Sequence, residues 1–244
     1  MADKYEQMSA DELYKFAEEL YAAEDDEEKD LEEIAELMKM AADKGSAIAQ
    51  CDYGVFLVNG EGVEKDEKTA LEYWKKSAEN NFAPALHKVA VCYLQGYCGE
   101  EKDEKKAFDY FMRAAEGGVK DSMFNVALFY QNGVGTEPDV NKAFEWIKKA
   151  AEAEQPQACY LLAMHYMTGT NGLPVDKEKS IALLTTAAES GFPEAQCTLG
   201  SCYETGSGVE KDLAEAAGWY RRSARAGLQQ ANESLKRLGF PGVM

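Results

Sequence analysis

The heptapeptide GEGVEKD at residues 60–66 returns as GSGVEKD at residues 206–212, with one letter changed. Three related segments stand between the two copies and keep the first glycine and the final aspartate. They are GYCGEEKD at 96–103, GVGTEPD at 133–139 and GTNGLPVD at 169–176. The heptapeptide is therefore one part of a repeated unit, and its spacing predicts stacked supersecondary units, not separate domains.

The repeated unit begins at a small residue and has a period of 36 or 37 residues. Its starting positions are Ala49, Ala85, Ser122, Ala158, Ala195 and Ala231. A glycine stands eleven residues after each of the first five positions, and an aspartate follows that glycine. These pairs are Gly60 and Asp66, Gly96 and Asp103, Gly133 and Asp139, Gly169 and Asp176, and Gly206 and Asp212.

The residues before each glycine have mostly helical spacing, as in Ala49, Tyr53 and Leu57 of the first unit. We call this segment helix A and predict that Gly60 ends it in a left-handed conformation. Asp66 then stands where its carboxylate can accept from the unpaired N–H groups of a second helix, helix B.

Helix B has a small, large, small stripe at four, eight and twelve residues after the aspartate. Small residues let neighbouring helices approach closely, and the large residue fills the space between them. The stripes are Ala70, Trp74, Ala78; Ala107, Phe111, Ala115; Ala143, Ile147, Ala151; Ser180, Leu184, Ala188; and Ala216, Tyr220, Ala224.

This pattern resembles the Sel-one-like repeat family. The segment AQCTLGSCYETGSGVEKDLAEAAGWYRRSARAG at residues 195–227 matches the repeat of that family almost throughout. The resemblance extends over about residues 47–239. Two departures occur in the other copies. Alanine replaces the glycine after the apolar residue at Ala90, Ala127 and Ala163, and Leu183 and Leu184 replace the aromatic pair of the fourth copy.

The resemblance implies an all-α fold, an α/α solenoid of helix pairs wound as a right-handed superhelix, with helix A lining a concave surface. It implies the binding of proteins far more than it implies chemistry. We expect one continuous domain with a degenerate capping repeat at 1–46, five repeats over 47–229 and a capping helix with its tail at 230–244. The five repeats are expected at about 47–82, 83–119, 120–155, 156–192 and 193–229.

The two ends have the features of caps. SADE at 9–12 has the form of a capping box and predicts a helix through about Ala23, and residues 31–45 predict a degenerate helix B. The segment EDDEEKD at 24–30 between them is expected to be a solvated acidic loop, with a functional acidic patch as the alternative. Ala231 and Leu235 continue the helix A pattern with a polar outer side.

The composition narrows the classes of function. A formal net charge of −18 disfavours binding of nucleic acid, because that needs clustered Lys and Arg. No signal peptide or membrane span is expected from the sequence, and the six cysteines have no regular spacing, so we expect reduced thiols in the cytoplasm. No cofactor is expected, and the chain is expected to be a monomer.

An enzyme would need a catalytic or metal-binding group of residues, and the sequence predicts neither. The two histidines, His87 and His165, stand at different positions of different repeats, so they are not expected to meet. The loop Gly60-Glu61-Gly62 fixes only one recurrent carboxylate, and calcium needs more oxygen ligands than that. A cysteine-rich branch of the family is secreted and has been linked to β-lactam binding, but its regular cysteine pairs are missing here. A β-lactamase-like hydrolase and a self-assembly module that uses the terminal repeats remain the alternatives.

By analogy with related helical-pair repeats, the sites at −1, 2, 6, 9 and 10 from the leading residue of helix A project toward the concave side. Only three of these twenty-five residues are charged, although charged residues make up 29% of the chain. Two columns of these residues suit an extended peptide. The apolar column is Val55, Val91, Leu128 and Met164, and the polar column of amides and hydroxyls is Asn59, Gln95, Asn132, Thr168 and Thr205. The predicted binding residues are His87, Val91, Gln95, Phe124, Leu128, Gln131, Asn132, Tyr160, Met164, Met167 and Thr168.

Both columns also have a purely structural interpretation. The apolar residues could pack between adjacent A helices, and the polar residues could cap the end of their own helix. With these alternatives open, the sequence predicts a non-enzymatic adaptor or scaffold that binds a protein or peptide on the concave face of the second to fourth repeats.

Overall fold

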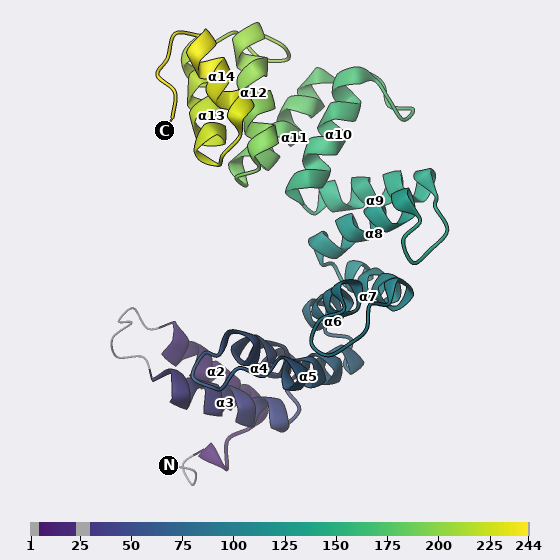
Figure 1. The fold of residues 1–244 in the computed structure, drawn as a ribbon, viewed down its shortest axis with the longest axis vertical. Helices are drawn as coiled ribbons and strands as arrows, with labels where there is room; N and C mark the ends of the chain where they lie inside the picture. The colour runs from purple at the N-terminus through teal and green to yellow at the C-terminus, as the bar shows by residue number, and fades with distance from the viewer. Residues whose placement is uncertain (1–4, 23–29, 244) are drawn as a thin grey trace. The chain divides into compact units, whose positions relative to one another are not determined.

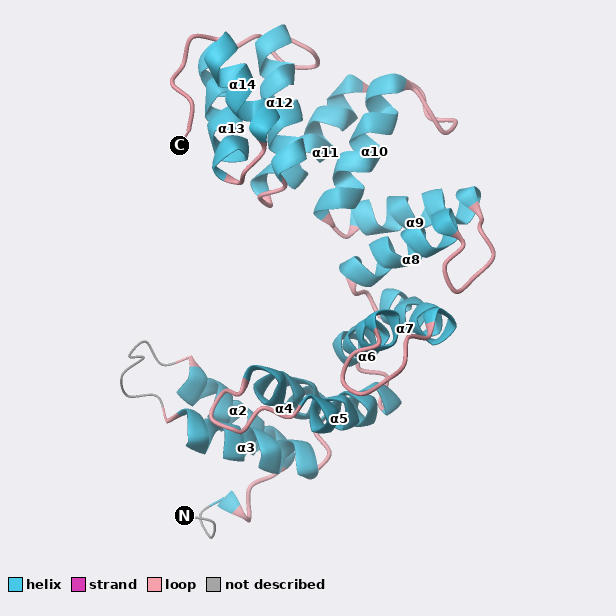
Figure 2. Cartoon of the chain, viewed as in Figure 1, coloured by secondary structure: helices cyan, strands magenta, loops and turns pink. Residues whose placement is uncertain are grey.

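The computed structural model describes residues 5–22 and 30–243, and every regular element in these ranges is a helix (Figure 1). Figure 2 shows the same helices joined by loops. The helices are α2 (Ala10–Tyr21), α3 (Leu31–Asp43), α4 (Ala47–Asn59), α5 (Glu67–Glu79), α6 (Ala83–Gln95), α7 (Glu104–Glu116), α8 (Lys120–Asn132), α9 (Val140–Glu152), α10 (Pro156–Thr168), α11 (Lys177–Glu189), α12 (Pro193–Thr205), α13 (Leu213–Arg225) and α14 (Gln229–Arg237).

The predicted helix boundaries follow from two residues of each repeat. Gly60 ends α4 with a φ of +74°, and its N–H donates to the carbonyl of Phe56. The Asp66 carboxylate then accepts from the N–H groups of Lys68 and Thr69 at 3.1 and 3.0 Å, which caps α5. The equivalent aspartates Asp103, Asp139, Asp176 and Asp212 cap α7, α9, α11 and α13 in the same way.

The loop between these two residues is closed by a backbone hydrogen bond. The N–H of Asp66 donates to the carbonyl of Leu57 at 2.9 Å, and the same bond joins Asp103 to Tyr93. The second glycine of the heptapeptide packs against the preceding helix B, because a Cβ at Gly62 would overlap the Leu31 carbonyl. The GxG pair is therefore required both for the end of one helix and for contact with another.

The stripes of helix B are buried, except that Ala224 at the end of the last stripe is partly exposed. Ala70, Trp74 and Ala78 are 0%, 6% and 2% exposed, and Phe111, Leu184 and Tyr220 are at most 2% exposed. Each of these residues faces the helix A of its own or a neighbouring repeat, so the core runs as a layer between consecutive helices.

The chain divides into two compact units. The first comprises Met1–Ser122 with Asn132–Pro138, and the second comprises Met123–Gln131 with Asp139–Met244. Consecutive helices pack against each other from α2 to α7 in the first unit and from α9 to α14 in the second.

Helices are present at both ends of the chain where the sequence predicts them. Ser9 and Glu12 form the capping box of α2, which ends at Tyr21, two residues earlier than predicted, and α3 likewise ends at Asp43. Ala231 and Leu235 of α14 are fully buried. Most of the acidic segment at 24–30 lies outside the described residues, and only its last residue, Asp30, is placed, as the N-cap of α3.

Candidate functional site

The eleven residues predicted to bind a partner lie on three A helices, α6, α8 and α10, and none of them is buried. We call these eleven residues the A-helix surface; four of them belong to the first unit and seven to the second. Gln95, Gln131, Asn132 and Thr168 are exposed. The other seven are partly exposed: His87, Val91, Phe124, Leu128, Tyr160, Met164 and Met167.

Several members of the A-helix surface also have structural contacts. In the second unit Phe124, Tyr160 and Met167 pack against one core cluster that includes Leu162 and Leu184. The Tyr160 ring meets Phe192 at a centroid distance of 5.5 Å and an interplanar angle of 64°. The aromatic positions therefore show part of each ring to solvent and use the rest for packing between repeats.

Two members of the polar column have the structural role that the sequence left open. The Thr168 hydroxyl donates to the carbonyl of Met164 at 2.8 Å, and Thr205 bonds Ser201 in the same way. These two hydroxyls satisfy their own helix, as the structural interpretation predicts.

Neither histidine has the surroundings of a catalytic group. His87 Nδ1 lies 2.7 Å from Ser122 Oγ, but Ser122 is 0% exposed, so a substrate has no access to this hydroxyl. Burial lowers the pKa of His87, whose ring meets Phe111 edge-on at 5.4 Å. His165 Nδ1 lies 2.7 Å from Thr170 Oγ1 in an exposed loop contact. Each histidine thus contacts side chains of the chain itself.

The described residues also show no clustered metal ligands and no helix that is long and apolar enough to cross a membrane. All six cysteines are described, and each is a buried thiol. Burial raises the pKa of the Cys51 thiol to about 12.

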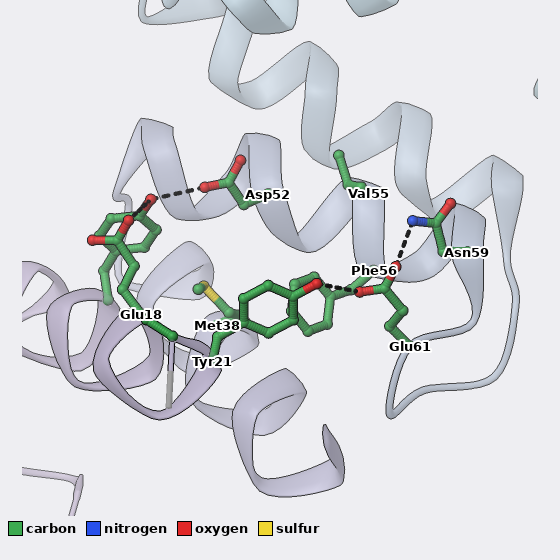
Figure 3. Close-up of a pocket in the computed structure, with 10 residues that line it drawn as sticks. Glu18, Tyr21, Met38, Asp52, Val55, Phe56, Asn59 and Glu61 are labelled. Atoms are coloured by element: carbon green, nitrogen blue, oxygen red, sulfur yellow. Dashed lines mark hydrogen bonds between the residues drawn. The ribbon is translucent and has the colours of Figure 1, made fainter. Parts of the chain in front are cut away.

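A pocket of about 430 Å³ lies between α2 and α4 in the first unit, and the sequence analysis did not predict it (Figure 3). Its apolar side is formed by Met38 of α3, Val55 and Phe56 of α4, and the ring of Tyr21. The rings of Tyr21 and Phe56 lie 5.6 Å apart between centroids. Tyr21 is 45% exposed, so the aromatic wall of the pocket is open to solvent.

Two carboxylates of this pocket meet at a single hydroxyl group. The Tyr14 hydroxyl oxygen lies 2.9 Å from Glu18 Oε1 and 2.8 Å from Asp52 Oδ2. A tyrosine hydroxyl has one proton, so it can donate to only one of them at a time. Burial raises the pKa of Asp52, and the charge of Glu18 raises it further, while the bond from Tyr14 lowers it.

The third carboxylate of the pocket is held by two donors. Glu61, from the loop of the first heptapeptide, accepts from Asn59 Nδ2 at 2.6 Å and from the Tyr21 hydroxyl at 3.3 Å. Figure 3 shows these two bonds at the end of the pocket opposite Glu18 and Asp52. The pocket therefore has fixed negative groups at both ends and an apolar surface between them.

A pattern in the sequence of α2 could have indicated these residues. Tyr14, Glu18 and Tyr21 are spaced i, i+4 and i+7, so they share one face of the helix. That face lay outside the repeat, and the contact of Tyr14 with Asp52, 38 residues away, is set only by the packing of α2 beside α4.

A layer of consecutive helix pairs that repeat every 36 or 37 residues defines an α/α solenoid. The family model for the Sel1 repeat matches residues 47–82, 83–119, 120–154, 156–192 and 193–228. The chain belongs to the Sel1 repeat family. Sel1 repeat proteins generally act as protein-interaction scaffolds and are typically not enzymes.

Solved structures with the same repeat resemble the chain closely. A Sel1 repeat protein from Oxalobacter formigenes superposes with a TM-score of 0.83 at 29% identity and covers 95% of this chain and 66% of its own. A protective antigen of uropathogenic Escherichia coli with the same fold has a TM-score of 0.79 at 26% identity over 97% of this chain and 50% of its own.

Curated relatives match only part of their own length. Chitin synthase regulatory factor 3 of Schizosaccharomyces pombe is 26% identical over 208 residues, which is 85% of this chain and 19% of the relative. DAP3-binding cell death enhancer 1 of Rattus norvegicus is 38% identical over 64 residues, which is 26% of this chain and 13% of the relative. The chain thus spans less than a fifth of the length of either relative.

Proposed function

We propose that the chain is a non-enzymatic adaptor or scaffold that binds a protein or peptide partner on its A-helix surface. The observation that carries the proposal is that all eleven residues of this surface keep some exposure, although several are apolar or aromatic. Apolar side chains that show to solvent in adjacent repeats favour an interaction surface. The names of two relatives, a regulatory factor and a DAP3-binding protein, support the same class of function.

The charge of the chain supports a protein partner over nucleic acid. There are 44 acidic against 26 basic residues, so a polyanion would be repelled by the overall field. Basic side chains of the outer helices are also engaged with aromatic rings. Lys149 lies 4.0 Å from the centroid of the Trp146 ring, and Arg222 lies 4.4 Å from that of Trp219.

The proposal is tested by truncating the two aromatic residues that occupy the same station in adjacent repeats, Phe124 and Tyr160. A partner is first purified by affinity capture, and its affinity is then measured by calorimetry. Phe124→Ala with Tyr160→Ala should weaken binding about tenfold or more, because aromatic residues commonly contribute about 2 kcal/mol or more at interfaces. The matched control reverses Lys148 and Lys149 on α9 and should change only the salt dependence.

Folding must be separated from binding, since Tyr160 also packs on Phe192. Each variant should keep the helicity of the parent and melt cooperatively. Met164→Lys offers a second test that removes no aromatic packing, because the Met164 side chain is partly exposed. Full affinity in well-folded Phe124/Tyr160 and Met164 variants, with loss on lysine reversal, would place the partner on the B helices and overturn the proposal.

A further inference from the structure

The pocket between α2 and α4 combines an apolar floor with an acidic rim. Its floor is Met38, Val55 and Phe56, and its rim is Glu18, Asp52 and Glu61. No lysine or arginine is among the described residues that line it. A side chain that is apolar along its stem and positive at its tip complements such a surface.

We propose that this pocket binds an arginine side chain from a basic segment of a protein partner. The aliphatic stem of the arginine lies along Met38 and Phe56, and its guanidinium group lies between the carboxylates of Glu18 and Asp52. The inference rests on the proposed function, that the chain binds proteins, and adds the chemistry of the partner at one site.

The size of the pocket suits this occupant. Sites for small molecules have volumes of about 300–1,000 Å³, and the pocket, at about 430 Å³, lies near the lower end. One long side chain with its adjoining backbone fills a space of that order. The exposed ring of Tyr21 forms one wall, against which a planar guanidinium can stack.

The arrangement at Tyr14 favours arginine over lysine. Because one hydroxyl proton serves two carboxylates, at 2.9 and 2.8 Å, one of the two lacks a donor from Tyr14. Arginine has five N–H donors in a fixed plane and can donate to both carboxylates at once, whereas lysine offers a compact point charge. We therefore expect affinity to fall in the order arginine, lysine, glutamine.

Positive charge from the chain itself does not neutralise the site. Lys88 of α6 lowers the pKa of Asp52, but burial and Glu18 still leave that pKa raised. The ammonium group of Lys88 lies 5.5 Å from the centroid of the Trp74 ring. The net charge of −18 further attracts a basic segment toward the chain.

The test uses a fluorescein-labelled, amidated peptide in which arginine alternates with leucine, and its lysine and glutamine counterparts. Binding is measured by anisotropy at an ionic strength of about 0.15 M, which screens distant charges. The arginine peptide should bind saturably, and Glu18→Gln with Asp52→Asn should weaken it about tenfold or more. The control, Glu72→Gln with Glu79→Gln on α5, removes the same charge from exposed positions and should change affinity less than about twofold.

The methyl group of Met38, at the floor of the pocket, locates the bound peptide by NMR. Its resonance should shift with the same saturation curve as the anisotropy. Equal loss of affinity in the two double variants, an unmoved Met38 resonance at saturation, or no saturable binding would each overturn the proposal. If the pocket fails in this way while a purified partner still depends on Phe124 and Tyr160, the proposed function stands without it.

Discussion

Gly54 of α4 lies directly against the indole ring of Trp74 of α5. A Cβ at Gly54 would stand 2.6 Å from Trp74 Cδ1 and would overlap the indole nitrogen, which donates to the carbonyl of Cys51 at 2.9 Å. Gly200 has the same relation to Tyr220, where the closest approach would be 2.9 Å. The glycine of the repeat is therefore required where the facing helix B residue is largest.

The three repeats with alanine at this position have smaller residues on the stripe. Ala90, Ala127 and Ala163 are followed on helix B by Phe111, Ile147 and Leu184. The departures from the family pattern thus have a steric explanation. Alanine adds a methyl group on helix A, and the smaller side chain on helix B leaves room for it.

Gly54→Ala should accordingly destabilise the chain by about 1–3 kcal/mol through overpacking, although alanine itself favours a helix. The same substitution in a Trp74→Phe background should be neutral or stabilising. Chemical denaturation of the four proteins of this double-mutant cycle provides the measurement. Gly218→Ala in α13, where a Cβ would meet nothing within 4 Å, is the control and should stabilise. A Gly54 variant that is harmless beside the intact indole would refute the steric explanation.

Asp139→Ala should cost about 0.5–2 kcal/mol, because its carboxylate accepts from the N–H groups of Asn141 and Lys142, both at 3.0 Å. Asp139→Asn keeps the accepting oxygen and should cost much less. Thermal unfolding with and without calcium completes the test, since the loop fixes too few carboxylates for that ion. A rise of several degrees on adding calcium would show that the loop is a metal site after all.

Asp52→Asn should make the chain more stable at neutral pH. Burial raises the pKa of Asp52 above its usual value of 3.8, so the native state binds this proton more tightly than the unfolded state does. The stability that this raised pKa of Asp52 gives the native state is present below pH 3.8 and is lost as the pH rises through the pKa of the folded chain. Asparagine is neutral at every pH, so the gain should be largest near pH 7 and shrink toward about pH 4.

Glu72→Gln, at an exposed site on α5, controls for the simple loss of one negative charge. Melting curves of the parent and both variants across this pH range give the comparison. If the stability gained by Asp52→Asn grew as the pH fell, the result would contradict this prediction. A carboxylate that lowers stability at neutral pH is typical of residues kept for binding.

All six cysteines should react with an alkylating reagent after unfolding without reductant, because each is a thiol in the structure. Mass spectrometry of the unfolded chain counts the modified residues. In the folded chain the reaction should be slow, since all six are buried and burial raises the pKa of Cys51 to about 12. Protected pairs after unfolding would contradict the prediction of reduced thiols.

The repeat itself could be predicted from the sequence because its main determinants are local. Gly60 ends a helix and Asp66 begins the next through conformations and hydrogen bonds within a few residues, and the period then fixes the stacking. The eleven residues of the A-helix surface could be chosen by the same periodicity. Their role in binding stays a prediction.

The pocket between α2 and α4 could not be predicted in this way. It depends on α2 and α3, which precede the five matched repeats, so no periodic neighbour indicates which face of α2 meets α4. The bond between Tyr14 and Asp52 joins residues 38 apart in the sequence and exists only because the two helices pack side by side. The shared proton and the raised pKa of Asp52 follow from that packing and not from any motif.

Hydrogen–deuterium exchange of the chain with and without a saturating purified partner tests the central claim, that the A helices form the binding surface. Amides of α8 and α10 should gain protection on binding, while those of α9 and α11 change little, because contact with a surface slows the local opening of the helix that carries it. Protection confined to the B helices α9 and α11, with α6, α8 and α10 unchanged, would contradict the account.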